Sequence, residues 1–179
     1  MVQPAAILIL SGPPGAGKTT VARAMAKASE GPAVHMHTDD FYTAIRKGFI
    51  LPWLPESHEQ NTTVARAIAA AATAYAVGGY AVMLDGIVGP WFLDIYRQAA
   101  GPVGVAIDFV VLRPDGPTAV ARARDREDAP IADYPLNMIE GFADLDPYEP
   151  HVIDTTGLSV DQVIDAIRDG QAQSRFRLG

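Results

Sequence analysis

The chain has 179 residues, of which 49% are hydrophobic, and a formal net charge of −7. This length and apolar content predict one domain over residues 1–179 with a substantial core. The scattered acidic residues argue against binding to nucleic acid or to an anionic membrane. The absence of cysteine excludes disulfides, zinc–thiolate sites and thiol catalysis. The composition indicates no particular oligomeric state.

The first apolar run, residues 5–10, leads directly into a loop that fits the phosphate-binding pattern G-x-x-x-x-G-K-[ST]. Residues 18–28 contain no glycine or proline and carry apolar side chains at helical spacing, so strand, loop and helix come in the required order. We therefore expect ATP to be bound by Gly12, Pro13, Pro14, Gly15, Ala16, Gly17, Lys18, Thr19 and Thr20. The alternative is a Gly/Pro-rich turn between a strand and a helix.

Free amides and the positive end of the helix dipole give this loop a physical reason to bind phosphate. Pro13 and Pro14 donate no N–H, so the amides of residues 15–19 must hold the phosphates. Lys18 is expected to reach the β- and γ-phosphates and Thr19 to ligate Mg²⁺. No basic region precedes the apolar run, which predicts a cytoplasmic protein without a signal peptide or a membrane span.

Four further apolar runs predict strands at residues 34–38, 80–84, 105–112 and 151–153. Helical patterns separate them, and strands that alternate with helices are typical of a parallel sheet with crossover helices. The expected fold is an α/β three-layer sandwich, in which a five-stranded parallel sheet has helices on both faces.

Two segments have the S-x-x-Q form of a capping box, beginning at Ser57 and Ser159. The first predicts a helix that runs to residue 77, with an inner stripe of Val64, Ile68, Ala71 and Tyr75. The second predicts a terminal helix before a frayed end at residues 175–179.

Two regions do not fit the alternation of strands and helices. Residues 49–55 are apolar but contain two prolines, which predicts a loop folded over a pocket. Residues 127–150 are rich in acids, prolines and aromatics, with one helical piece near 136–142, and we expect them to form a lid. The acceptor-binding segment is expected within residues 43–79.

Open parallel sheets bind ligands at the carboxyl ends of their strands, and Asp39 and Asp40 follow the second predicted strand. A carboxylate there can accept the proton of a substrate hydroxyl that attacks a γ-phosphoryl group, and we expect Asp39 to be this base. Asp40, Tyr42 and Arg46 are expected substrate contacts. The alternative for the two acids is that they only cap the helix that follows.

Asp85 closes the third predicted strand and is expected to support Mg²⁺ through water. The alternative is a simple Asp-Gly turn with Gly86. Trp91 follows shortly after and is expected either to form a wall of the substrate pocket or to pack in the core.

A helix that opens near Pro117 carries Arg122 and Arg126, which are four residues apart and therefore share a face. Arginines that close over the phosphates would stabilise the transition state of phosphoryl transfer. The alternative is a solvated helix face paired with nearby acids.

The histidines give a weaker signal. His35 and His37 alternate on one predicted strand, but no third metal ligand accompanies them, so a structural role is expected. His58 lies in the first capping box and is a possible substrate contact.

Four segments together resemble the small-molecule kinase branch of the phosphate-loop proteins, near the chloramphenicol phosphotransferase-like and gluconate kinase-like families: residues 12–20, 38–42, 112–126 and 153–157. The Asp-x-Phe-Tyr segment resembles the uridine kinase segment that holds the catalytic acid, at the position of Asp39. The resemblance implies the P-loop fold of nucleoside and nucleotide kinases, and it places Arg122 and Arg126 in or near a lid over ATP. It also implies adenine contacts at Thr155, Thr156 and Gly157.

The sequence thus predicts an ATP- and Mg²⁺-dependent phosphotransferase that moves the γ-phosphoryl group to a hydroxyl of a small molecule, such as a sugar, an antibiotic or a nucleoside-like compound. One alternative is a nucleoside monophosphate kinase, in which Arg46 and Lys47 would bind the acceptor phosphate. A second alternative is an ATPase or nucleotide-binding switch without a small-molecule acceptor.

Overall fold

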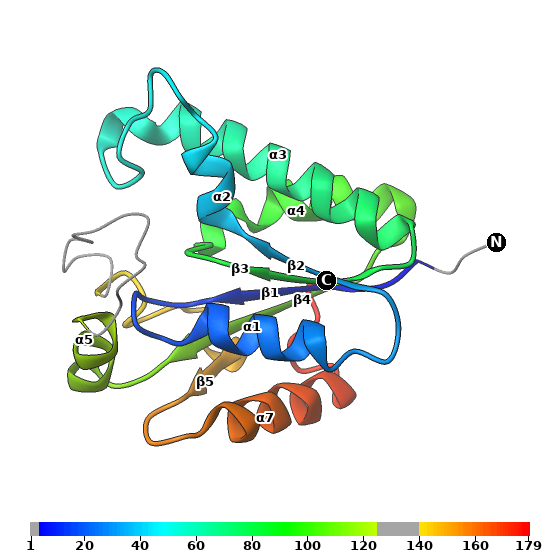
Figure 1. Ribbon diagram of the computed structural model, residues 1–179, viewed down its shortest axis with the longest axis vertical. Coiled ribbons are helices and arrows are strands. Elements are labelled where there is room, and N and C mark those ends of the chain that lie inside the picture. Colours follow the sequence, from blue (N-terminus) through cyan, green and yellow to red (C-terminus); the bar gives the residue numbers. More distant parts are fainter. Residues whose placement is uncertain (1–3, 125–139) are drawn as a thin grey trace.

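Parallel strands form the centre of the molecule. The computed structural model describes residues 4–124 and 140–179, and in this part of the chain five strands make one sheet in the order β2-β3-β1-β4-β5. All four strand pairs are parallel, and helices cover both faces (Figure 1). The strands are β1 (Ile7–Ser11), β2 (Ala33–His37), β3 (Ala81–Asp85), β4 (Ile107–Arg113) and β5 (Val152–Asp154). The predicted α/β three-layer sandwich is confirmed.

Side chains of the central strands alternate between two apolar layers, as expected for pleated strands that are buried on both faces. Ile7 and Ile9 of β1 pack in the layer beneath α3 (His58–Val77) and α4 (Leu93–Ala100). Leu8 and Leu10 face α1 (Lys18–Lys27) and α7 (Val160–Ala172) on the other side. The remaining elements are α2 (Thr38–Thr43), α5 (Gly116–Arg124) and 3₁₀ turns at Pro55–Ser57, Pro90–Phe92, Gly101–Val103 and Glu149–His151.

The capping box predicted at Ser159 is confirmed, whereas the one predicted at Ser57 is wrong. Ser159 accepts a bond from the Gln162 amide, and Gln162 returns one to the Ser159 amide. Ser57 instead ends a 3₁₀ turn with helical backbone angles and caps nothing. A residue in that conformation cannot turn its hydroxyl back to the first amides of α3, because a capping residue needs extended backbone angles.

The inner stripe predicted for α3 is only partly correct. Val64 and Ile68 are buried as expected, but Tyr75 is 46% exposed and packs edge-to-face against Tyr80. The buried positions continue instead through small residues: Ala65, Ala69, Ala72 and Ala76. Alanines let the helix approach its neighbours closely, so the larger ring is left on the outer side.

The frayed end predicted at residues 175–179 is wrong. Phe176 is fully buried and packs against Gly170 of α7, where an added Cβ would lie 2.1 Å from the Phe176 ring. The backbone of residues 176 and 178 exchanges hydrogen bonds of 2.9 Å with Phe109 and Ile107, forming an antiparallel bridge. Because β5 pairs only with residues 111–113, this tail covers the start of β4 that would otherwise remain an open edge.

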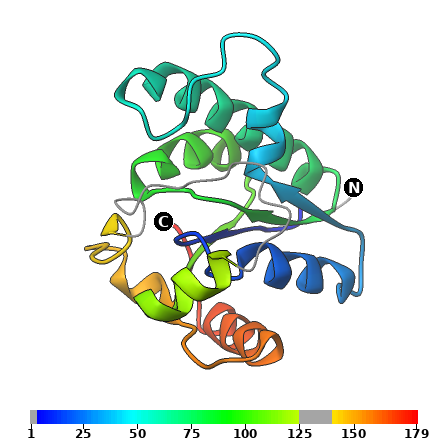
Figure 2. The same ribbon diagram turned by 60° about the vertical axis from the view of Figure 1, so that its left-hand side comes forward.

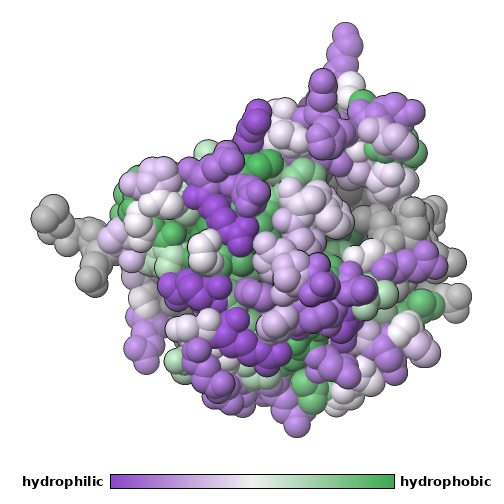
Figure 3. Space-filling model, turned by 180° about the vertical axis from the view of Figure 1, so that it is seen from behind, coloured by the Kyte–Doolittle hydropathy of each residue, from purple (hydrophilic) through white to green (hydrophobic). Residues whose placement is uncertain are grey.

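The surface carries no extended apolar area on the face shown in Figure 3, where hydrophilic and apolar residues are interspersed. Trp91 is the most exposed large apolar side chain that the structure describes, at 68%. No helix within residues 4–124 and 140–179 is long and apolar enough to cross a membrane.

The docked tail makes a stability prediction. Phe176→Ala should lower the free energy of unfolding by about 3–5 kcal/mol, because it removes a fully buried ring and leaves a cavity. Urea titration followed by circular dichroism measures this change. Phe49→Ala is the matched control, since Phe49 is 38% exposed and should change the stability far less. Equal effects of the two substitutions would show that the tail does not dock in solution.

Candidate active site

The phosphate-loop motif connects β1 to α1 at the carboxyl end of the sheet, which Figure 2 turns toward the viewer. β1 pairs with β3 on one side and β4 on the other, and open parallel sheets bind ligands where the strand order changes direction in this way. Gly12 has a φ of 138°, and an added Cβ would lie 2.1 Å from the carbonyl oxygen of Leu112. Glycine is therefore required for the loop to pass so close to β4.

Lys18 is the first residue of α1 and is only 5% exposed. Its Nζ donates hydrogen bonds of 2.9 Å to the carbonyl oxygens of Gly12 and Pro13, so the loop curls around the ammonium group. The N-cap residue Gly17 has left-handed backbone angles and no side chain to bond the first amides of the helix. The start of α1 therefore combines a buried cation with amides that no capping side chain occupies.

Asp85, the last residue of β3, is fully buried and is held by three donors. Thr19 Oγ1 donates to Asp85 Oδ2 over 2.6 Å, His37 Nδ1 lies 3.0 Å from the same oxygen, and His35 Nε2 bonds Oδ1. Burial acts to raise the pKa of Asp85, but these hydrogen bonds outweigh it and hold the pKa well below its usual range. Asp85 is thus an ionised carboxylate directly beside the phosphate loop.

His37 lies between two carboxylates. Its Nδ1 faces Asp85, and its Nε2 is 3.4 Å from Asp39 Oδ2. A neutral imidazole has one N–H, so donating to both acids requires the protonated ring. Hydrogen bonds to Asp39 and Asp85 raise the pKa of His37 from 6.5 to about 10. A continuous chain of polar contacts therefore runs from Thr19 through Asp85 and His37 to Asp39.

The register of the sheet creates this chain. β2 lies beside β3 with His37 opposite Asp85, and His35 projects to the same side two residues earlier. Gly86, just after β3, allows Thr38, just after β2, to lie against it, because an added Cβ at position 86 would be 1.9 Å from Thr38 Oγ1. Within the described residues these groups form no cluster of three or more metal-ligating side chains, and the expected structural role of the two histidines agrees with their contacts to Asp85.

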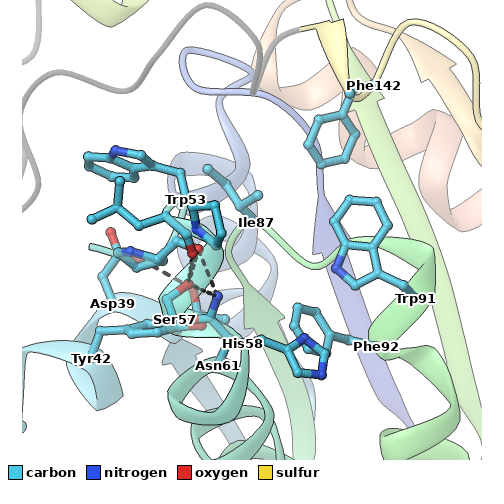
Figure 4. A pocket seen from close by; sticks show the side chains of 15 residues that line it. Asp39, Tyr42, Trp53, Ser57, His58, Asn61, Ile87, Trp91, Phe92 and Phe142 are labelled. Atoms are coloured by element: carbon cyan, nitrogen blue, oxygen red, sulfur yellow. Dashed lines mark hydrogen bonds between the residues drawn. The ribbon is translucent and has the colours of Figure 1, made fainter. Parts of the chain in front are cut away.

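Beside Asp39 lies a cavity of about 380 Å³, drawn in Figure 4. Its described lining includes one carboxylate, Asp39, and neither lysine nor arginine. Burial, assisted by the charge of Asp39, raises the pKa of Tyr42 to about 12, so its phenol stays neutral. The lining residues are mostly apolar or aromatic: Thr38, Asp39, Tyr42, Pro52, Trp53, Leu54, Pro55, Ser57, His58, Asn61, Ile87, Trp91, Phe92, Gly141 and Phe142.

The predicted loop over a pocket is confirmed, because Pro52, Trp53 and Leu54 line this cavity. Two side chains on the first turn of α3 hold the loop. Gln60 makes paired hydrogen bonds to the backbone of Ile50, of 2.8 and 2.6 Å, and Asn61 Nδ2 donates to Pro52 O over 2.7 Å. The loop is therefore fixed by side-chain contacts to its backbone, although it contains no helix or strand before Pro55.

The cavity wall that contains Ile87 is hydrogen-bonded to Ser11, the last residue of β1. Ser11 accepts a 3.0 Å bond from the Val88 amide and donates a 2.7 Å bond to the Val88 carbonyl, which fixes the segment that carries Ile87. Trp91 lies directly against Gly89, where an added Cβ would be 2.2 Å from the indole. The residue that precedes the phosphate loop thus also positions the cavity wall.

The predicted substrate contacts divide into two pairs. Tyr42 and Trp91 line the cavity, as do the predicted base Asp39 and His58. Asp40 and Arg46 do not line it, and both are exposed. Because Asp40 follows Asp39 on a helix, its side chain projects in another direction.

Of the two groups predicted on the ATP side, the structure describes only residues 155–157. Thr156 Oγ1 accepts a 2.8 Å bond from the Asp115 amide, and Gly157 has a φ of 70°, so residues 155–157 form a tight loop beside the start of α5. The side chain of Arg122 is not among those described, and Arg126 lies outside the described residues, as does most of the helical piece predicted near 136–142.

Sequence reasoning missed several residues that shape the site. The bridging position of His37 was not foreseen, nor were the roles of Ser11, Gln60 and Asn61. Only the role of Ser11 had a signal in the sequence, because Ser11 is a polar residue at the end of an apolar strand. The pairing of His37 with Asp85 depends on strands 48 residues apart and left no local signal.

Comparisons with known proteins agree with this geometry. The model of the AAA_33 family, described as an AAA domain, matches residues 7–143, which is more than half of the chain. No curated protein matches the chain. The solved structures described next share the phosphate-loop fold that the motifs predicted.

Three solved structures illustrate the shared fold. A sugar kinase from Janibacter sp. HTCC2649 is 19% identical, with a TM-score of 0.71 and coverage of 94% of this chain and 95% of that one. A gluconokinase from Sinorhizobium meliloti 1021 is 18% identical, with a TM-score of 0.62 and coverage of 98% and 95%. The Mycobacterium tuberculosis APS kinase in complex with AMPPNP and APS is 16% identical, with a TM-score of 0.61 and coverage of 94% and 99%.

The bridging imidazolium predicts a pH dependence of stability. The pKa of His37 is about 10 in the folded protein and 6.5 for the free group. The stabilisation that protonated His37 adds to the free energy of unfolding is therefore fully present below pH 6.5 and is lost as the pH rises toward about 10. The stability difference between the wild type and His37→Gln should fall steadily across this window, measured by urea unfolding in the presence of a chelator.

His151→Gln is the control, because the His151 ring hydrogen-bonds a backbone carbonyl, that of Phe109, and makes no ion pair with a carboxylate among the described residues. Its effect on stability should not follow the same course. A His37→Gln difference that stays constant from about pH 6 to pH 10 would refute the bridge between the two carboxylates.

Proposed function

The chain belongs to the AAA_33 family of AAA domains, and from this premise we propose that it is an ATP- and Mg²⁺-dependent phosphotransferase that acts on a hydroxyl of a small molecule. The observation that carries the proposal is the chain of contacts from Thr19 through Asp85 and His37 to Asp39. It joins the phosphate loop at one end to the wall of a cavity at the other. Phosphoryl transfer requires a nucleotide and an acceptor in this relation.

On the nucleotide side, Lys18 and the amides at the start of α1 would hold the β- and γ-phosphates. Lys18 Nζ would exchange its bonds to the Gly12 and Pro13 carbonyls for phosphate oxygens, which are charged and therefore stronger acceptors. Thr155, Thr156 and Gly157 would lie against the adenine ring, and Arg122 and Arg126 would close over the transferring group.

The oxygen atoms of Thr19 and Asp85 are suitable ligands for Mg²⁺. A hydroxyl and an ionised carboxylate lie 2.6 Å apart, and Mg²⁺ prefers a few such oxygens together with water and phosphate. Thr19 would ligate the ion directly and Asp85 through water. When bound, the ion neutralises negative charge on the β- and γ-phosphates.

On the acceptor side, Asp39 would accept the proton of the substrate hydroxyl. The hydroxyl oxygen then forms a bond to the γ-phosphorus, the bond from that phosphorus to the β–γ bridging oxygen breaks, and ADP leaves with the bond electrons. His37 would hold the Asp39 carboxylate in position through its Nε2 contact. Positioning and neutralisation of charge would supply most of the rate, because this transition state needs little covalent assistance.

The proposal predicts that Asp39→Asn lowers kcat by about 100-fold or more, because the amide cannot accept the proton, while ATP affinity changes only a few-fold. ADP release is measured over sugars, antibiotics, nucleosides and nucleoside monophosphates. Asp40→Asn is the matched control, since Asp40 is exposed and does not line the cavity.

Unchanged turnover in Asp39→Asn would remove Asp39 as the base. ADP release that does not depend on any acceptor would support an ATPase instead. Turnover that requires a nucleoside monophosphate would favour the nucleotide kinase alternative.

A further inference from the structure

Arg113, the last residue of β4, contacts a segment that forms part of the cavity wall. We propose that Arg113 is a positioning residue for the acceptor: its side chain fixes the wall at Gly141 and Phe142 relative to the phosphate loop and takes no part in binding ATP. This inference rests on the proposed function, and it concerns a side chain that does not itself line the cavity.

The guanidinium group of Arg113 bonds two parts of this segment at once. Nη1 and Nη2 each donate to one carboxylate oxygen of Glu149, both over 2.8 Å. Nη1 also donates to the backbone carbonyls of Phe142 and Ala143, over 3.0 and 3.2 Å. A planar group with several N–H donors is needed for this pattern, so the contact fixes direction as well as distance.

Glu149 extends the contact to the middle of the segment. Its Oε1 also accepts a 2.9 Å bond from the Leu145 amide. The hydrogen bonds from Arg113 and from the Leu145 amide lower the pKa of Glu149 to about 2. The carboxylate is therefore ionised at neutral pH, where arginine is always charged, and the pair persists under assay conditions.

The segment needs such an anchor because residues 141–148 contain neither helix nor strand. Phe142 and Leu145 are buried and pack in the core layer beneath α3 and α4, and Phe142 forms part of the cavity wall (Figure 4). A single exposed ion pair contributes little to stability. A bidentate pair that also bonds backbone carbonyls restricts where the wall lies, which is the property that a binding site requires.

Position 113 also lies beside the nucleotide side of the site. The carbonyl oxygen of Leu112, the preceding residue, lies so close to Gly12 of the phosphate loop that no side chain fits there. The carbonyl of Arg113 accepts a 3.4 Å bond from the amide of Thr155. These contacts use the backbone, so a substitution that changes only the side chain should move the cavity wall and leave the nucleotide side intact.

Hydrogen–deuterium exchange followed by mass spectrometry tests the anchor without any ligand. Arg113→Gln should speed exchange of the amides in residues 141–149 by at least about tenfold, with no change in residues 18–27 of α1. Glu149→Gln should do the same, and the double variant should add little to either, because both remove one shared contact. Arg113→Lys should resemble Arg113→Gln, since one ammonium group cannot reproduce the planar fork.

Steady-state kinetics separate positioning from a merely structural role. The acceptor is the compound that gives the highest ADP release among the sugars, antibiotics, nucleosides and nucleoside monophosphates named above. Arg113→Gln should raise the KM for this compound by at least about tenfold, while kcat and the affinity for AMPPNP stay within about threefold. Arg177→Gln is the matched control, because Arg177 pairs with Asp108 near the other end of β4 and should change neither KM nor exchange in residues 141–149.

Unchanged exchange in residues 141–149 of Arg113→Gln, an equal increase in α1, or full rescue by Arg113→Lys would each overturn the inference. Loss of AMPPNP affinity with an unchanged acceptor KM would also overturn it, because Arg113 would then serve the nucleotide. ADP release that depends on no acceptor would count against the proposed function instead. The exchange experiment would still decide whether Arg113 holds the cavity wall, so the two failures are distinguishable.

Discussion

The buried carboxylate of Asp85 is the group on which the geometry of the site depends. A charge that is fully removed from water must be paired or hydrogen-bonded, since otherwise its desolvation costs several kcal/mol. Asp85 meets this requirement through Thr19, His35 and His37, which come from α1 and β2. The carboxylate therefore joins three elements that local sequence patterns treat separately. β2 is an edge strand with mostly half-buried side chains, and its polar contacts to Asp85 supplement a modest apolar packing.

His37 resolves an electrostatic conflict in this arrangement. Asp39 and Asp85 both approach its ring, and two carboxylates so close together would repel each other without a cation between them. An imidazolium offsets that repulsion and fixes the direction of both acids. The acid beside the phosphate loop and the acid beside the cavity are thus parts of one hydrogen-bonded network.

Periodicity and position were sufficient to predict the sheet, the phosphate loop, and the placement of Asp39 and Asp85 at one edge of the sheet, because parallel strands bring their carboxyl ends together. They did not predict contacts set by strand order and register, such as the pairing of His37 with Asp85. The docked tail was missed for a similar reason: only the three-residue length of β5 reveals that the start of β4 needs a cover. A short motif was also insufficient by itself, because the same S-x-x-Q pattern forms a capping box at Ser159 but none at Ser57.

The missing cap at Ser57 also indicates how the loop side of the cavity is built. The polar residues that open α3 are used to hold a loop instead of capping the helix: Gln60 binds the Ile50 backbone, and Asn61 binds Pro52. Trp53 and Leu54 lie on this loop and reach the cavity, whereas Lys18, Thr19 and Asp85 belong to the phosphate loop and the sheet. Side chains at residues 52–54 can therefore change without disturbing the groups assigned to phosphoryl transfer, because their backbone is anchored independently. Under the proposed function, a division of this kind would let one rigid scaffold position the nucleotide while a short anchored loop determines which acceptor fits.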